Sequence, residues 1–175
     1  MRMLEVRYGR LHNISMAVVA LIMAAIAVAF LARGSAHGMA MSFSDARFVL
    51  YLLLGAAMAF YAWVGFDRFR NRAPQIVIDH DGIVLGFGRN SRFTWDDVEW
   101  VRVRRLGVRP TLQLGIAPEA FFKANLRLSM WALDDALRPV RGMPAALAVR
   151  DNGLDTQAPA MLDAVKSFRP NLVRS

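Results

Sequence analysis

The residues of this chain that are most suggestive of binding chemistry are six arginines close together in sequence: Arg89, Arg92, Arg102, Arg104, Arg105 and Arg109. Arg102 and Arg104 are two residues apart in a predicted strand, so their side chains share one face. Beside a membrane, such a cluster can hold anionic lipid headgroups at about 1 kcal/mol per residue. Four acidic residues can neutralise part of it: Asp96, Asp97, Glu99 and Glu119. The cluster predicts a contact surface for anionic lipid or a protein partner, with a solvated, salt-bridged face as the simpler alternative.

The other ionisable residues do not form a recognisable catalytic or metal-binding pattern. His12, His37 and His80 are far apart in sequence, and no pair has the spacing of metal ligands. The pairs Asp96–Asp97 and Asp134–Asp135 are adjacent, so their side chains diverge on a strand or a helix and do not suggest an acid–base pair. The absence of cysteine removes thiol nucleophiles and thiolate metal sites. The sequence therefore predicts a protein that is not an enzyme, with no cofactor, no metal and no evident small-molecule substrate.

Two apolar stretches over residues 14–32 and 48–66 contain no Asp, Glu, Lys, Arg or His. As a helix each would extend about 28 Å, close to the roughly 30 Å hydrocarbon core of a bilayer. They predict a transmembrane helical hairpin over residues 14–66, preceded by a tail over residues 1–13. Small residues recur at four-residue spacing, a pattern that favours close helix packing in lipid. These pairs are Ala20 with Ala24, Ala25 with Ala29, and Gly55 with Ala59.

The charges that flank the hairpin predict its orientation. The outer flanks carry Arg2, Arg7 and Arg10 before the first span and Arg68, Arg70 and Arg72 after the second. The connecting stretch holds only Arg33 and Arg47. The positive-inside rule then places both termini and the C-terminal domain in the cytoplasm, as in a multi-pass protein of a bacterial inner membrane. A cleaved signal peptide is the competing interpretation of the first span, but its apolar core would be only about 7–15 residues long.

Residues 73–170 predict one small α+β domain. Strand-like runs cover residues 75–79, 83–87, 101–106, 111–116 and 145–150, separated by turns rich in Gly, Asn, Asp and Pro. From residue 118 to 137 the apolar spacing becomes helical, with Phe122, Leu126 and Leu137 on one face. A last helix has Met161 to Phe168 as its apolar segment and Thr156 as its expected cap.

The runs IVIDHDGI over residues 76–83 and FTWDDVEWVRV over residues 93–103 resemble the bacterial pleckstrin-homology-like domain family. Its members often show an acid–Gly–Ile turn and a later W-x-D-[IV]-x-x-[IV] motif. The layout is also similar to a group of small two-span membrane proteins with such a domain behind the second helix. The resemblance implies a membrane helical hairpin plus a small antiparallel PH-like β domain with a C-terminal helix, to which the segment from residue 118 adds an amphipathic helix.

Six residues of these two runs are expected to support the fold: Gly82, Ile83, Trp95, Asp96, Asp97 and Trp100. Trp95 can fill the end of a small barrel, and Asp96 or Asp97 can accept hydrogen bonds from backbone N–H groups of the turn that follows. Because Trp95 and Trp100 are expected to lie mostly inside, the sequence shows no exposed aromatic platform for bases, and nucleic acid is not an expected partner.

These features together predict a non-enzymatic membrane protein whose cytoplasmic domain acts as a scaffold. The expected contacts are membrane lipids and a protein partner or a second copy of the chain. An anionic-lipid sensor that uses the arginines of residues 89–109, and an accessory subunit of a larger membrane complex, are the alternatives. The amphipathic segment would cover the open end of the barrel, or lie in the membrane interface with Phe121, Phe122 and Trp131 facing the lipid.

Overall fold

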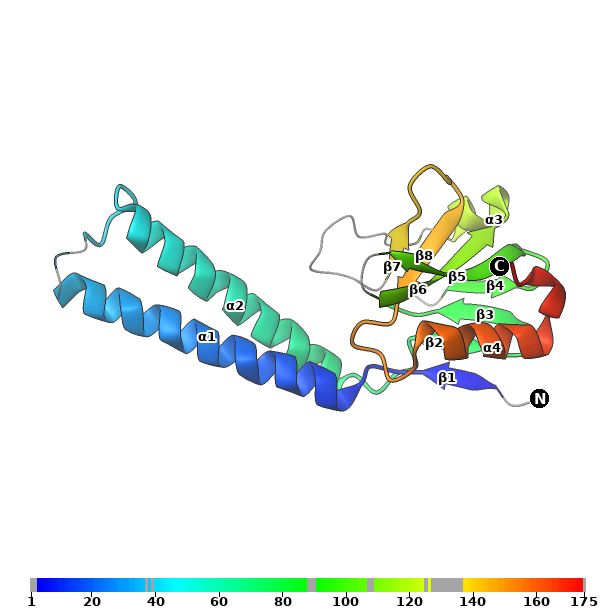
Figure 1. The fold of residues 1–175 in the computed structure, drawn as a ribbon, viewed down its shortest axis with the longest axis horizontal. Helices are drawn as coiled ribbons and strands as arrows, with labels where there is room; N and C mark the ends of the chain where they lie inside the picture. Colours follow the sequence, from blue (N-terminus) through cyan, green and yellow to red (C-terminus); the bar gives the residue numbers. More distant parts are fainter. Residues whose placement is uncertain are drawn as a thin grey trace. The chain divides into compact units, whose positions relative to one another are not determined.

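The computed structural model describes residues 3–36, 38, 40–87, 91–106, 109–124, 126 and 137–174. The chain forms two compact units (Figure 1). One is a helical hairpin over residues 9–71, and the other is a β domain that combines residues 72–175 with the N-terminal residues 1–8.

The hairpin consists of α1 (Arg10–Ala36) and α2 (Ala46–Arg70). Both helices are long and apolar enough to cross a membrane, and both extend beyond the predicted spans. Their outward surfaces are almost entirely apolar, with exposed side chains that include Val19, Leu21, Val28, Leu53 and Trp63. Apolar area on this scale is unfavourable in water, so a lipid surrounding is the environment that this surface fits.

The two helices pack through small side chains. The side chains that α1 buries are Asn13, Ala17, Ala20 and Ala27, and α2 buries Gly65. A Cβ atom at Gly65 would lie 2.8 Å from the Asn13 carbonyl oxygen and 3.0 Å from the Ala17 Cβ atom. This close approach is the small-residue packing that stabilises helix pairs in lipid.

The predicted small-residue pairs only partly match this interface. Ala20 is buried and Gly55 faces Ala27, whereas Ala25, Ala29 and Ala59 are exposed. The buried positions of α1 follow spacings of four, three and seven residues, which is the heptad period of two helices that wind around each other. A strict four-residue spacing drifts off that seam.

The start of α2 is capped by Asp45, whose Oδ1 atom accepts a hydrogen bond from the Arg47 backbone N–H at 2.9 Å. Hydrogen bonds from the Arg47 side chain, and then from its backbone N–H, lower the pKa of Asp45 below its ordinary value. The cap is therefore fully formed at pH values above the ordinary pKa of an aspartate carboxyl group. It is lost as the pH falls through the lowered pKa of Asp45.

The β domain contains two antiparallel four-stranded sheets (Figure 1). The first has the order β1-β2-β3-β4, with β1 at Leu4–Val6, β2 at Ile76–Ile78, β3 at Gly82–Leu85 and β4 at Ser91–Thr94. The second has the order β5-β6-β8-β7, with β5 at Val98–Leu106, β6 at Arg109–Ile116, β8 at Ala146–Arg150 and β7 at Leu137–Pro139. The helical elements are α3 (Pro118–Lys123), α4 (Ala158–Phe168) and a 3₁₀ turn, η1 (Pro170–Leu172). The α+β class predicted for this region is confirmed.

The core lies between the sheets and against α4. Apolar residues of both sheets form one cluster with α4, and Met161 and Val165 of this helix are fully buried. The helix contacts β5 and β6 of the second sheet and β2 of the first. Its N-terminus is capped by Asp151, whose Oδ2 atom accepts from the Ala158 N–H at 3.2 Å. The predicted cap, Thr156, donates its hydroxyl to Asp155 instead.

The N-terminal residues form part of the β domain instead of a separate tail. Val6, which is 0% exposed, pairs with Ile76, and Leu4 pairs with Ile78. The Arg7 N–H donates to the Asp155 carboxylate at 3.0 Å, and the Arg7 carbonyl accepts from the Asp155 N–H at 2.9 Å. The hairpin is therefore an insertion between two paired strands. Three residues are too few to show a strand period in sequence, so only the pairing with β2 reveals this strand.

The segment after β6 also differs from its prediction. The helix α3 ends at Lys123, residues 125 and 127–136 lie outside the described part of the chain, and Leu137 begins β7 instead of ending a helix. Phe121 enters the core, while Phe122 is 69% exposed. The prediction that Phe122 lies on the buried face of this helix is thus wrong, and its neighbour Phe121 is buried instead. Contact with the core, and not the local period, selects which side chain is buried.

Substituting Gly65→Ala is expected to lower the free energy of unfolding of the hairpin by about 1–3 kcal/mol, since the new methyl group meets backbone that cannot move aside. The matched control is Gly55→Ala, whose Cβ atom would lie 3.6 Å from that of Ala27. This control keeps or slightly raises stability, because alanine is the better helix former. Thermal unfolding in detergent, followed by circular dichroism, compares the two. Equal midpoints would contradict the close packing at Gly65.

Substituting Val6→Asp in the full chain is expected to destabilise the β domain by about 2–5 kcal/mol, because it removes a buried side chain and places a carboxylate in the core. Met3→Asp is the control, since Met3 is 51% exposed and precedes the strand. Urea titration followed by tryptophan fluorescence measures both. If Val6→Asp behaves like Met3→Asp, the N-terminal strand does not complete the first sheet.

Candidate functional site

The β2–β3 turn is organised by the carboxylate of Asp79, which is 8% exposed. Its Oδ1 atom accepts from the backbone N–H groups of Asp81 at 2.9 Å and Gly82 at 3.1 Å. Its Oδ2 atom accepts from Nη2 of Arg92 on β4 at 3.1 Å. An aspartate that bonds to the backbone two and three residues ahead is a turn-forming arrangement. Asp79 therefore holds this hairpin turn and ties it to β4.

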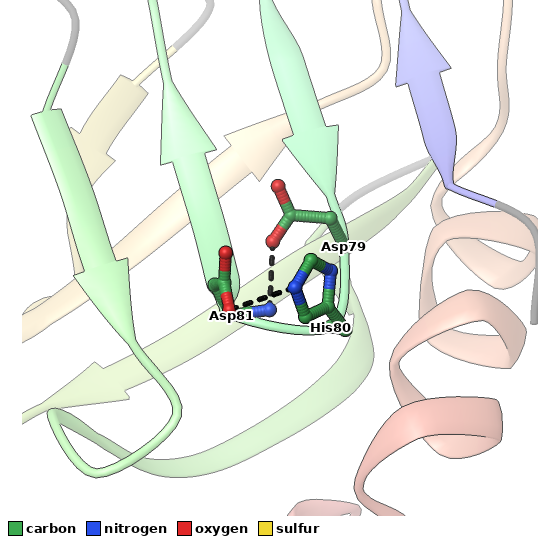
Figure 2. Close-up of side chains that lie close together, drawn as sticks. All are labelled: Asp79, His80 and Asp81. Carbon is green, nitrogen blue, oxygen red and sulfur yellow. Dashed lines mark hydrogen bonds and ion pairs between the residues drawn. The ribbon is translucent and has the colours of Figure 1, made fainter.

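The turn also contains the one cluster of potential metal ligands found among the described residues. Ligand atoms of Asp79, His80 and Asp81 lie within 4.8 Å of one another, and His80 Nε2 is 3.0 Å from Asp81 Oδ1 (Figure 2). Both oxygens of Asp79 already accept hydrogen bonds, and the Arg92 guanidinium also lies 3.3 Å from Asp81 Oδ2. A cation would have to compete with this fixed positive charge. We assign the cluster to the turn and not to a metal.

Gly82 and Trp95 join this turn to the rest of the domain. A Cβ atom at Gly82 would collide with the backbone carbonyl of Phe93 on β4, so only glycine permits this approach. The indole N–H of buried Trp95 donates to the Asp79 and His80 carbonyl oxygens at 3.1 and 2.9 Å. The Trp95 ring stacks on Phe168 of α4 with centroids 6.3 Å apart. Ile83 lies in the core. These residues link β2, β3, β4 and α4.

Asp97 holds the turn between β4 and β5. Its Oδ2 atom accepts from the Thr94 N–H at 2.9 Å and from the Thr94 hydroxyl at 2.7 Å. The expectation that the donors follow the aspartate in sequence is wrong, since they precede it. The neighbouring Asp96 is exposed. Both residues lie in the turn between β4 and β5, and the local bonds to Thr94 hold Asp97 and not Asp96.

The four of the six arginines whose side chains the structure describes do not form one surface. Arg92 lies on the first sheet, where it is ion-paired to Asp79 and Asp81. Arg102 lies on the second sheet, where its Nε atom donates to Gln113 at 2.8 Å. Arg104 and Arg105 are exposed and form no ion pair with any residue that the structure describes. Arg109 begins β6, and Arg89 lies outside the described residues.

Arg102 belongs to a layered arrangement on the outer face of β5 and β6. Its guanidinium carbon is 4.8 Å from the centroid of the Trp100 ring, a cation–π contact. The Trp100 indole lies over Gly115, where a Cβ atom would overlap the ring. Trp100 is therefore only partly buried, in contrast to the expectation that it lies inside. Its ring lies flat on the sheet because Gly115 is the residue opposite it on β6.

Strand pairing brings two further arginines to this outer face. One row of paired residues across the sheet consists of Arg104, Thr111 and Arg150. The neighbouring row consists of Arg102, Gln113, Ala148 and Arg138. Paired residues of an antiparallel sheet share one face. The sequence contains no local signal for this grouping, because β5 and β8 meet only through β6. Gln113, 1% exposed, separates these arginines within the sheet.

The structure shows a groove of about 580 Å³ between β4 and α3. Its lining residues on the β4 side are Ser91, Arg92, Phe93 and Asp97, and on the α3 side Glu119, Ala120, Lys123 and Ala124. The Ser91 hydroxyl donates to the Ala124 carbonyl at 3.2 Å, and the Ala117 N–H donates to the Asp97 carbonyl at 2.8 Å. These bonds join the two walls of the groove beside Ser91 and beside Asp97. Sequence patterns did not reveal it, because its walls are more than twenty residues apart in the chain.

Substituting Asp79→Ala is expected to cost about 2–4 kcal/mol of domain stability, since two backbone N–H groups and a guanidinium lose their shared acceptor. Asp81→Ala is expected to cost less than about 1 kcal/mol, because this carboxylate is half-exposed. Urea titration measures both variants. Excess Zn²⁺ is expected to leave the midpoint of the unmodified protein unchanged, and a rise that both variants abolish would indicate a metal site instead.

The geometry above is the basis for a functional assignment, since comparison with protein-family models, with curated proteins and with solved structures finds no match to this chain.

Proposed function

We propose that this chain is a non-enzymatic scaffold of a bacterial inner membrane, in which a helical hairpin anchors a cytoplasmic PH-like domain that binds a protein partner. The observation that carries the proposal is the open groove between the edge strand β4 and α3. The edge of a sheet is a common place for proteins to receive an extended segment of another chain.

Support for the anchor comes from the insertion of the hairpin between β1 and β2. Residues 7–9 connect β1 to α1, and residues 71–75 connect α2 to β2. Fully extended, these connections span at most about 11 and 18 Å. Because β1 and β2 pair with each other, both ends of the hairpin belong to one folded domain and therefore lie on one side of the membrane. The arginines on both outer flanks favour the cytoplasmic side.

Support for a PH-like domain comes from the arrangement of the sheets and from the motif residues. Two antiparallel sheets enclose one core, and the C-terminal α4 contacts strands of both. Gly82, Trp95 and Asp97, which carry the resemblance, all hold turns or strand contacts. The motif is therefore a folding signature, and the binding surface has to be sought elsewhere on the domain.

An anionic-lipid sensor is the weaker candidate. Arg92 is already held by two carboxylates, and Arg102 by Gln113 and Trp100. Among the described side chains of this cluster, Arg104 and Arg105 remain available, and two residues supply only about 2 kcal/mol near an anionic surface. An accessory subunit is the third candidate, since the exposed apolar surface of the hairpin would also fit a larger membrane protein.

The proposal is tested by extracting the tagged full-length chain into native lipid discs and identifying the co-purifying molecules by mass spectrometry. We expect a protein companion, or a second copy of the chain, in stoichiometric amount. A monomer without a protein companion across several extraction conditions would contradict the proposal. Enrichment of one anionic lipid without protein would make the lipid sensor the better assignment, with Arg104 and Arg105 as the residues to reverse in charge.

A further inference from the structure

The β4 side of the groove offers a backbone position that can pair with another strand. The Trp95 N–H points toward β3, since it donates to the Asp81 carbonyl, and the Thr94 N–H points away from β3, since it donates to Asp97. Backbone groups alternate in direction along a strand. The N–H and carbonyl of Arg92, two residues before Thr94, therefore point away from β3, into the groove that Arg92 helps to line.

The α3 side of the groove has opposite charges at its two ends. The helix begins beside Asp97, where the Ala117 N–H bonds to the Asp97 carbonyl, so Glu119 and Asp97 form an acidic end. It finishes beside Ser91, which bonds to Ala124, so Lys123 forms a basic end. Glu119 and Lys123 are both exposed. Ala120 lies between Glu119 and Lys123 in the helix, and Ala124 follows Lys123. Both side chains are small enough to leave the groove open.

The spacing of these charges matches an extended chain. Four residues of helix separate Glu119 from Lys123 by about 6 Å along the axis. Alternate residues of a β-strand, which share one face, are about 6.7 Å apart. Two neighbouring side chains on one face of an extended segment would therefore lie opposite Glu119 and Lys123, while the residue between them pairs with Arg92.

We propose that the β4–α3 groove binds an extended segment of a protein partner with a basic residue, any residue and an acidic residue in that order. This inference rests on the proposed function, whose partner it describes chemically. The order of the two charges follows from the direction in which the segment pairs with β4. The N–H and carbonyl of Arg92 both point into the groove, and in an antiparallel pair one residue exchanges both backbone hydrogen bonds with the residue opposite it. A segment antiparallel to β4 enters at the acidic end, so its basic residue comes first and faces Glu119. Its acidic residue then faces Lys123.

The test uses the full-length protein in lipid discs and two blocked synthetic peptides of identical composition. One contains Lys-Val-Asp and the other Asp-Val-Lys, each flanked by Thr and Val, which favour extended backbone. Titrations followed by NMR or by fluorescence anisotropy are expected to show about tenfold tighter binding of the Lys-Val-Asp peptide. Equal binding of the two peptides, or binding of neither, would overturn the inference.

A charge-exchanged variant, Glu119→Lys with Lys123→Glu, supplies the matched control. It is expected to reverse the preference toward the Asp-Val-Lys peptide, which a misfolded groove could not do. The neutral variant Glu119→Gln with Lys123→Gln is expected to bind both peptides equally. In the disc experiment, a companion retained equally by the charge-exchanged variant would overturn this inference and leave the scaffold function in place. Loss of any companion from the unmodified protein would overturn the scaffold function itself.

Discussion

The pairing of β1 with β2 is the constraint on which the rest of the molecule depends. These two strands enclose the whole hairpin in sequence, and together they make half of the first sheet. The chain leaves the domain after Tyr8 and returns to it at Arg72, and the Gln75 N–H donates to the Val6 carbonyl at 2.7 Å. In sequence, the hairpin is therefore an insertion between two paired strands of the β domain.

This arrangement sets an order for folding. The first strand is synthesised before the two apolar helices, and its partner only after them. The first sheet is complete only when both helices have been made, which brings strands that are distant in sequence together and carries the usual loop-closure cost. The Arg7–Asp155 bonds add a second attachment near α4, so the N-terminal segment is held on two sides.

A second consequence concerns which charges are available for binding. The domain uses Asp79, Asp97 and Arg92 to hold its turns, and it uses Arg102 to cover Trp100. Of the six arginines that suggest a binding surface in sequence, Arg92 and Arg102 are thus held by other side chains of the domain. Among the described residues that line the β4–α3 groove, Glu119 and Lys123 are exposed charges beside the edge strand β4. This groove, and not the arginine cluster, is therefore the surface that favours binding of an extended peptide.

The two apolar helices and most strands of the domain could be predicted from sequence alone, because each depends on local period, turn residues or bulk hydrophobicity. The packing of the folded chain was needed to show that Leu4–Val6 is a strand and that Phe121 and not Phe122 enters the core. It also decided that the arginines separate and that β4 and α3 form a groove. These outcomes depend on pairing between distant segments, which no local pattern encodes.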